Sequence, residues 1–154
     1  MNVRAVEVGR RRYLGLLLLA DPSETAILGY LNRGHLLVAE LNGRTIGVAH
    51  LDPLPDGGVE LRNLAMVEDL QGQGYGKALM REVVVFCRQR GYGRIRVGTG
   101  NSSLGNLAFY QKLGFRLVGV QRDYFLSYPT PIYENGLRCL DLVQLELPLA
   151  PTTK

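Results

Sequence analysis

Apolar and polar residues alternate along seven short stretches of the chain, a pattern typical of half-buried β-strands. Asn42-Gly43 separates two of these stretches. Because both central residues of a type I′ turn need positive φ, this dipeptide predicts a β-hairpin. A Pro/Gly-rich turn at 52–58 and an irregular segment at 122–138, which contains an Asn135-Gly136 turn, separate others. The predicted strands are residues 3–8, 35–41, 44–51, 59–67, 94–99, 115–120 and 139–147.

Helical periodicity and capping residues predict four helices between these strands. The second helix has the clearest start: Asp21 is expected to cap it, Pro22 to take its first position and Glu24 to complete a capping box. We expect helices over residues 14–20, from 22 to near Gly34, over about 74–90, and from a cap at Asn101, Ser102 or Ser103 to Leu113.

The length and composition indicate one folded α/β domain. The chain has 154 residues, of which 46% are hydrophobic, so neither a disordered nor a fibrous protein is expected. A single domain spanning residues 1–154, with its core at about 3–147, follows from the usual domain size. The apolar run from Tyr13 to Ala20 is much shorter than the ~18 residues of a membrane span, so no membrane partner is expected. Three arginines precede this run as in a signal peptide, but no small-residue cleavage pattern follows, and we interpret it as an amphipathic helix.

The few cysteines and histidines exclude two kinds of chemistry. Cys87 and Cys139 are too few for a disulfide framework, and with only His35 and His50 beside them there is no metal-ligand spacing. The sequence therefore predicts no metal site and a reducing, cytoplasmic location.

The charge is uneven along the chain, which carries a net +4. The third helix would bury Leu79, Val83, Phe86 and Cys87 and expose Lys77, Arg81 and Arg88. Such a basic face is either simply solvated or suited to a phosphorylated ligand. Nucleic acid is not expected, because aromatic residues do not interleave with the bases and no binding motif is present.

The stretch with the clearest chemistry is Leu70–Lys77, between a strand and a helix. Glycines at 72, 74 and 76 allow the backbone to approach a ligand closely, and the free N–H groups at the helix start form an anion site. Phosphate or pyrophosphate is the expected ligand. The spacing fits neither a Walker loop nor a dinucleotide fingerprint, because Gln71, Lys77 and Leu79 stand where those motifs need glycine or alanine. A purely structural turn is the alternative.

Two motifs together resemble the GCN5-related N-acetyltransferase (GNAT) family. Gln71-x-x-Gly74-x-Gly76 matches the family's (Gln/Arg)-x-x-Gly-x-(Gly/Ala) loop, and residues 106–115 resemble its second signature, which begins with Asn and ends at Gly-Phe. The resemblance implies a mixed, mostly antiparallel twisted sheet of about seven strands flanked by about four helices. Its two central parallel strands, ending at Met66 and Gly98, would splay apart to admit acetyl-CoA. Glu68, where the family often has proline, departs from the pattern.

The resemblance also implies site roles. The backbone after the splay would hold the pantetheine arm, with the Met66 N–H facing the thioester oxygen, and the glycine loop would hold the pyrophosphate. Asn106 would contact the pantetheine, and Tyr110, one helical turn later, would protonate the leaving thiolate. The residues implied in cofactor binding are Leu64, Ala65, Met66, Gln71, Gly72, Gln73, Gly74, Tyr75, Gly76, Lys77 and Asn106.

Glu60 matches the position of a catalytic glutamate in many family members, but it could equally be a sheet acid paired with Arg62 or Arg96. A carboxylate is a weak base toward an ammonium group, so catalysis would require burial of Glu60 or a bridging water. Acceptor contacts are expected from the first two helices and the segment after Val120. That segment is either an acidic, aromatic-lined mouth for a cation or an ordinary loop. Its candidate side chains are Asp123, Tyr124, Tyr128, Tyr133 and Glu134.

These features lead to an acetyl-CoA-dependent N-acetyltransferase that acts on a primary amine of a small molecule or a protein. A catalytically silent acyl-CoA-binding sensor or interaction module is the alternative from another class. The alternating last strand at 139–147 would also be available to pair across a homodimer.

Overall fold

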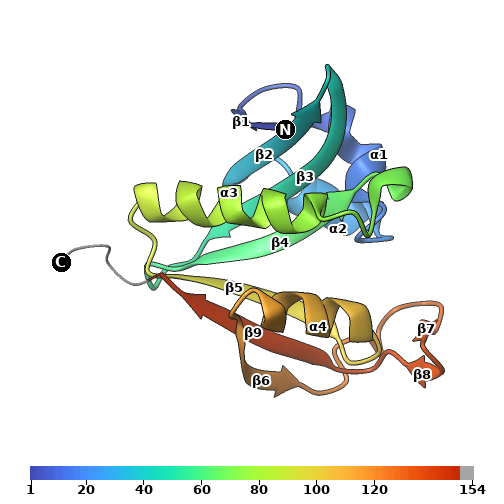
Figure 1. The fold of residues 1–154 in the computed structure, drawn as a ribbon. Coiled ribbons are helices and arrows are strands. Elements are labelled where there is room, and N and C mark those ends of the chain that lie inside the picture. Colours follow the sequence, from blue (N-terminus) through green and yellow to red (C-terminus); the bar gives the residue numbers. More distant parts are fainter. Residues whose placement is uncertain (150–154) are drawn as a thin grey trace.

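The computed structural model describes residues 1–149, which form one twisted seven-stranded sheet in the order β1-β2-β3-β4-β5-β9-β6 (Figure 1). Neighbouring strands are antiparallel except β4 and β5, which are parallel. A small β7–β8 hairpin follows β6. The strands are β1 Asn2–Val6, β2 His35–Leu41, β3 Arg44–Pro53, β4 Val59–Met66, β5 Arg94–Gly100, β6 Arg116–Gln121, β7 Tyr133–Glu134, β8 Leu137–Arg138 and β9 Leu142–Pro148.

Helices cover both faces of the sheet. Leu79, Val83 and Cys87 of α3 pack with Tyr110 of α4 in one core, which confirms the expected apolar face of the long helix. Leu17, Ile27 and Tyr30 of α1 and α2 pack on the opposite face in a second core. The helices are η1 Arg10–Tyr13, α1 Leu14–Leu17, α2 Glu24–Tyr30, η2 Glu68–Leu70, α3 Tyr75–Gln89 and α4 Leu104–Lys112.

Local turn chemistry sets most of the boundaries. Asn42 (φ 52°) and Gly43 (φ 80°) both adopt positive φ, which confirms the predicted hairpin between β2 and β3. The predicted cap at Asp21 is wrong. The hydroxyl of Ser23 accepts the Ala26 N–H at 3.1 Å, and Asp21 instead accepts the N–H of Ser23 at 3.0 Å. The α2 helix therefore begins at Glu24, two residues after its predicted first position at Pro22.

The last strand is shorter than predicted and lies inside the sheet. The Asn101 side chain accepts the N–H groups of Leu140 and Asp141 at 2.8 and 2.9 Å, so these two residues are not part of the strand ladder. The strand β9 begins at Leu142 and pairs with β5 on one side and β6 on the other. Because both its edges are occupied, the expectation that it could pair across a dimer is wrong, and β6 forms that edge of the sheet.

The sheet opens between its two parallel strands. The β4–β5 pairing covers only Val59, Glu60 and Leu61 of β4. The register against β3 then shifts, so that Arg62 is an extra residue between two paired positions. A bulge of this kind bends a strand and increases its twist. The bulge therefore coincides with the point where β4 leaves β5, and the two strands diverge in Figure 1.

Candidate active site

The divergence leaves backbone groups of β4 without a neighbouring strand. The Val67 N–H donates to the Ile46 carbonyl of β3 at 2.9 Å. Successive peptide groups of a strand point to opposite sides, so those of Leu64 and Met66 point away from β3 and toward the opening. Ala65, opposite Val48, has its peptide groups turned toward β3. Two of the three predicted pantetheine residues thus offer backbone groups to the opening, with Ala65 held between them.

The glycine loop is fixed to the end of β4 by side chains. Gln71 Nε2 donates to the Met66 carbonyl at 3.0 Å, and Gln73 Nε2 donates to the Asp69 carbonyl at 3.1 Å. The Gln71 N–H donates to the Glu68 carbonyl at 3.3 Å, so it already has an acceptor. The loop therefore presents the N–H groups that follow Gln71.

Two of the three glycines are required by backbone conformation. Gly72 has φ 78° and Gly74 has φ 90°, values that side chains with a Cβ rarely adopt, although there is open space around both. Gly76 lies in the first turn of α3. A Cβ there would lie 3.7 Å from Met66 Cγ and 3.8 Å from the Phe109 ring, an ordinary contact distance. The start of α3 is thus close to both β4 and α4.

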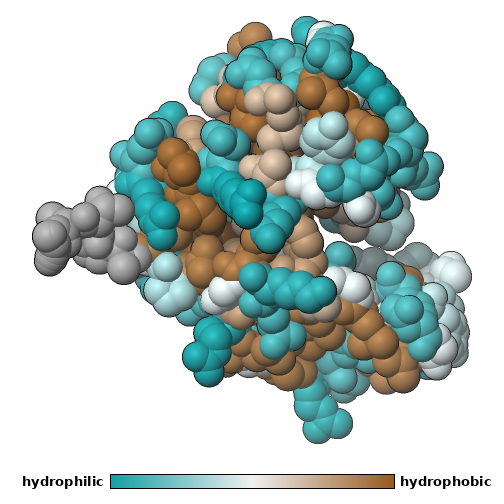
Figure 2. Space-filling model, viewed as in Figure 1, coloured by the Kyte–Doolittle hydropathy of each residue, from teal (hydrophilic) through white to brown (hydrophobic). Residues whose placement is uncertain are grey.

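The N-terminus of α3 is an anion site by its geometry. Gly74 occupies the N-cap position of this 15-residue helix, and among residues 1–149 no side-chain hydrogen bond caps its first N–H groups. Unpartnered N–H groups and the helix dipole both attract negative charge. A groove of about 470 Å³ continues from here between α3 and α4, and Figure 2 shows hydrophobic surface exposed between these helices. The groove has four basic residues in its lining: Lys77, Arg81, Arg88 and Lys112.

Tyr110 lies on α4, one turn after Asn106. Its ring is buried against Phe109 and Phe115, with centroids 5.1 and 5.4 Å away. Burial raises the pKa of Tyr110 far above its ordinary value, so the phenol stays protonated. Asn106 is exposed in the first turn of the same helix. The Tyr110 hydroxyl is therefore a protonated group on α4, and α4 faces the start of α3.

Glu60 lies at the base of the opening rather than within it. Its carboxylate is 3.4 Å from Arg62 Nη1, so the ion pair that the sequence left as an alternative is present. Arg96 instead bonds Glu146, at 2.7 and 2.9 Å. Val59 and Leu61 belong to the α3 core, and alternation therefore turns Glu60 toward the face that α1 and α2 cover.

A buried polar cluster on that face was missed by sequence reasoning. Asn63, 4% exposed, donates from Nδ2 to the Leu17 carbonyl at 3.0 Å and to the Tyr30 hydroxyl at 3.1 Å. His50, opposite Asn63 on β3, has its Nε2 2.8 Å from the Arg33 carbonyl. A carbonyl only accepts, so Nε2 carries the proton. Burial lowers the pKa of His50 to about 4, and the ring stays neutral.

In the segment after Val120, one of the candidate acidic side chains is bonded within the fold. Glu134 accepts hydrogen bonds from the hydroxyls of Ser102 and Ser103 at 3.1 and 2.8 Å, which ties the β7–β8 hairpin to the start of α4. That carboxylate is therefore committed to the fold. Burial raises the pKa of Tyr128, and the charge of Asp21 adds to this rise.

A sequence model of the acetyltransferase (GNAT) family matches residues 12–115, a range that includes the open strand β4, the glycine loop and α4. The chain belongs to the GNAT family. The family assignment confirms the resemblance seen in the two motifs, and it makes the protein an acyltransferase.

Several GNAT relatives are similar over most of the chain. An uncharacterized N-acetyltransferase of Bacillus subtilis, YvbK, is 42% identical over 135 residues, which are 87% of each chain. The structure of a GNAT family acetyltransferase from Elizabethkingia anophelis with acetyl-CoA bound is 38% identical with a TM-score of 0.92, over 96% of this chain and 97% of that one. A Bacillus subtilis acetyltransferase in complex with CoA gives the same identity and TM-score, over 97% and 99%. These likenesses confirm the predicted fold class.

The described part of this GNAT chain has neither a membrane-crossing helix nor a metal-binding cluster. None of the helices within residues 1–149 is long and apolar enough to cross a membrane. Over the same residues, no group of three or more His, Cys, Asp or Glu side chains could hold a metal ion. Cys87 and Cys139 are both free and buried.

Proposed function

We propose that this GNAT protein transfers an acetyl group from acetyl-CoA to a primary amine. The observation that carries the proposal is that the Leu64 peptide groups and the Met66 N–H point toward the opening and lead to the N-terminus of α3, where the N-cap residue Gly74 has no side chain. The two similar structures named with acetyl-CoA or CoA bound support it. An extended pantetheine arm would bond the open edge of β4 as an added strand does.

The charged end of CoA fits the adjoining surface. Its pyrophosphate would accept N–H groups of residues 72–77, where the backbone is exposed and the helix dipole is favourable. The groove between α3 and α4 adds the positive charge of Lys77, Arg81 and Lys112 for the remaining phosphate. Asn106, exposed at the start of α4, would bond the pantetheine.

The chemistry needs an uncharged amine. At pH 7, deprotonating a lysine-like amine of pKa near 10.4 costs roughly 4.6 kcal/mol, and an α-amino group near pKa 8 costs about 1.4 kcal/mol. The free amine attacks the thioester carbonyl carbon, and the Met66 N–H stabilises the oxyanion that forms. The carbon–sulfur bond then breaks, and Tyr110 donates its proton to the departing sulfur.

Glu60 would act through water in this reaction rather than directly. Its carboxylate is engaged by Arg62 at 3.4 Å and lies at the base of the opening, below the open peptide groups. A water beside it could carry the amine's proton to solvent. We therefore assign Glu60 an indirect role as base and Tyr110 the direct role as acid.

The direct test measures thiol release from acetyl-CoA with a panel of primary amines, together with calorimetric titration of acetyl-CoA. We expect binding, and release that depends on the amine. Tyr110→Phe should lower turnover by roughly 100-fold or more while leaving acetyl-CoA affinity within about twofold. Tyr92→Phe, which removes a hydroxyl bonded to His35 Nε2 beyond the end of α3, is the matched control and should change neither quantity.

Three results would contradict the proposal. Absence of acetyl-CoA binding would remove it altogether. Tight binding without turnover on any amine would favour a silent sensor instead. Equal losses of affinity and turnover in Tyr110→Phe would make the tyrosine a packing residue.

A further inference from the structure

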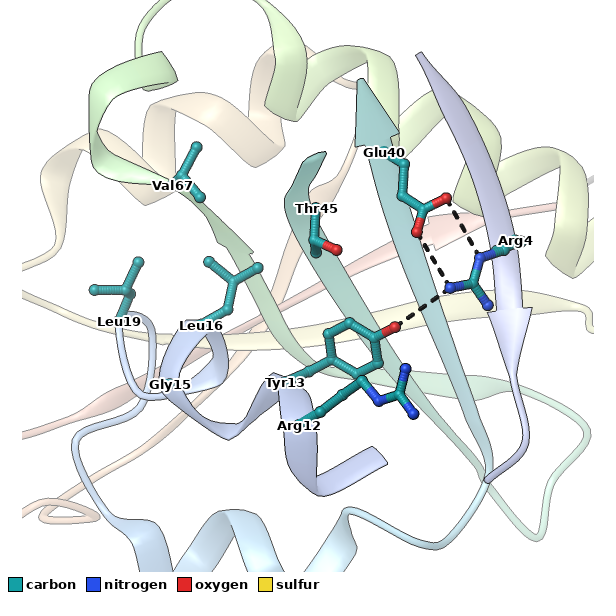
Figure 3. Close-up of a pocket in the computed structure, with 9 residues that line it drawn as sticks. All are labelled: Arg4, Arg12, Tyr13, Gly15, Leu16, Leu19, Glu40, Thr45 and Val67. Carbon is teal, nitrogen blue, oxygen red and sulfur yellow. Dashed lines mark hydrogen bonds and ion pairs between the residues drawn. The ribbon is translucent and has the colours of Figure 1, made fainter. Parts of the chain in front are cut away.

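A second cavity lies on the α1 face of the sheet, separate from the open edge of β4. It has a volume of about 510 Å³, within the usual range for small-molecule sites. Figure 3 shows side chains from β1, β2, β3, α1 and the residue after β4 around it. Its lining residues are Arg4, Arg12, Tyr13, Gly15, Leu16, Leu19, Glu40, Thr45 and Val67.

The two ends of the cavity differ in chemistry. In Figure 3 the side chains of Leu16, Leu19 and Val67 gather at one end, and the charged side chains gather at the other. The hydroxyl of Thr45 lies between the two ends. A ligand that fills this space therefore has an apolar body and a polar head.

The charges at the polar end favour an anionic head. Arg4 donates to both carboxylate oxygens of Glu40, at 3.4 and 3.1 Å, and these two charges compensate each other. Arg12 forms no ion pair with any residue of the described range 1–149. One positive charge is thus left over, which matches a head with a single negative charge.

The hydrogen-bonding groups at this end also suit a carboxylate. The Tyr13 hydroxyl accepts from Arg4 Nη2 at 3.4 Å, so its own proton is available to a ligand. The guanidinium of Arg12 supplies paired donors in the geometry that a carboxylate accepts. Arg4, held by Glu40 and Tyr13, adds no net charge but fixes the tyrosine in place.

We propose that this cavity is a second ligand site, which binds a small monocarboxylate with an apolar body. The carboxylate lies between Arg12 and the Tyr13 hydroxyl, and the apolar body lies against Leu16, Leu19 and Val67. None of its lining residues belongs to the glycine loop or to α3 and α4, although Val67 directly follows Met66 at the end of β4.

The experiment uses hexanoate as the probe and measures its affinity for the full chain by amide NMR titration. We expect saturable binding with a Kd on the order of 1 mM, as befits a ligand of this size. The affected amides should belong to α1, to the start of β3 and to Val67. Hexylamine and hexanamide, with the same apolar body but no negative charge, should bind at least tenfold more weakly.

Two variants locate the binding. Arg12→Gln should weaken hexanoate at least tenfold, and Arg11→Gln, at a neighbouring exposed arginine outside the lining, should stay within twofold of wild type. Gly15→Leu should block the cavity, because Gly15 lines it and a Cβ there has nothing within 4 Å. Thermal unfolding shows whether each variant folds. If Gly15→Leu does not fold, the comparison of Arg12→Gln with Arg11→Gln decides the test by itself.

The proposal is overturned if hexanoate fails to bind, or if Arg12→Gln binds it as tightly as Arg11→Gln does. Equal binding of hexylamine would also overturn it, since the charge argument would then be wrong. Acetyl-CoA titrated into the same samples reports separately on the open edge of β4, so failure at one site does not imply failure at the other.

Discussion

The two sides of the opening between β4 and β5 are built from different materials. On the α3 side, the ligand-facing groups are backbone N–H groups, held in place by glycines with positive φ and by two glutamine amides. On the α1/α2 side, the β4 residue Asn63 is held by groups from distant parts of the chain, because its amide donates to the Leu17 carbonyl and to the Tyr30 hydroxyl. One side of the opening is thus fixed by local backbone rules, and the other by contacts between distant residues.

Arg10 is the central example of the second kind of construction. It is 5% exposed, and its guanidinium donates at 2.9 to 3.0 Å to the carbonyls of Val6, Leu31, Arg33 and Gly34. Three of these carbonyls follow the end of α2, where a positive charge is favoured by the helix dipole. One side chain therefore ties the end of β1 to the segment that follows α2.

The largest expected effect comes from removing that side chain. Arg10→Met should lower the free energy of unfolding by about 4 kcal/mol, because two buried and two partly buried carbonyls lose a charged donor. Arg11→Met, at an exposed neighbour, should stay within about 0.5 kcal/mol of wild type. Urea denaturation measures both, and equal losses would mean that the carbonyl contacts do not hold the α1/α2 side.

The next effect is a pH dependence on the same side. Burial lowers the pKa of His50 to about 4, while the unfolded chain has the ordinary value near 6.5. The unfolded state therefore binds more protons between these values, so stability is full above about pH 6.5 and falls by up to about 3 kcal/mol toward pH 4. Burial also lowers the pKa of His35, which adds a loss of the same sign.

His50→Gln separates the two histidines. This variant should flatten the acid loss measured by urea denaturation between pH 4 and 7, while the share from His35 remains. An unchanged pH profile would show that the pKa of His50 is the same in the folded and the unfolded protein.

Substitutions in the glycine loop should change the affinity for acetyl-CoA more than the free energy of unfolding. Gly74→Val places a β-branched residue at φ 90° and should weaken acetyl-CoA binding roughly 30-fold, or about 2 kcal/mol. Gly76→Ala is the matched control, because its Cβ meets only ordinary contacts, and it should stay within about twofold. Calorimetry measures both, and equal affinities would remove the conformational argument for the loop.

The smallest effect concerns the start of α2. Ser23→Ala should lower the free energy of unfolding by about 1 kcal/mol, because the Ala26 N–H loses its acceptor. Asp21→Ala should cost less, since Asp21 bonds the loop before the helix. A larger loss in Asp21→Ala would show that Asp21, and not Ser23, caps the helix.

The same contrast explains what could be predicted from the sequence. The Asn42-Gly43 hairpin and the conformations of Gly72 and Gly74 follow from local backbone rules, and the sequence predicted them. The roles of Arg10 and Asn63 could not be predicted, because their partners lie 21 to 46 residues away for the contacts to Leu31 and Leu17. The break in alternation within β4 predicts a bulge, but it does not predict which groups the buried amide of Asn63 would bond.

Some predictions failed for the same physical reason. Of the three residues that the sequence allowed as the cap of α4, Ser103 stands at the N-cap, but its hydroxyl bonds Glu134 rather than a helix N–H, and Asn101 bonds Leu140 and Asp141. Glu134, which the sequence placed either at an acidic mouth or in an ordinary loop, accepts hydrogen bonds from Ser102 and Ser103. Polar residues in loops choose among several partners, and only the folded chain decides which.

The central claim is that free amides at the open edge of β4 and at the start of α3 hold acetyl-CoA. Amide NMR of the full chain titrated with acetyl-CoA tests it most directly. The account predicts that the largest shifts occur at Leu64, Met66 and residues 72–77, with those of β1 and β2 unchanged. Saturable binding that leaves Met66 and the glycine loop unshifted would contradict it.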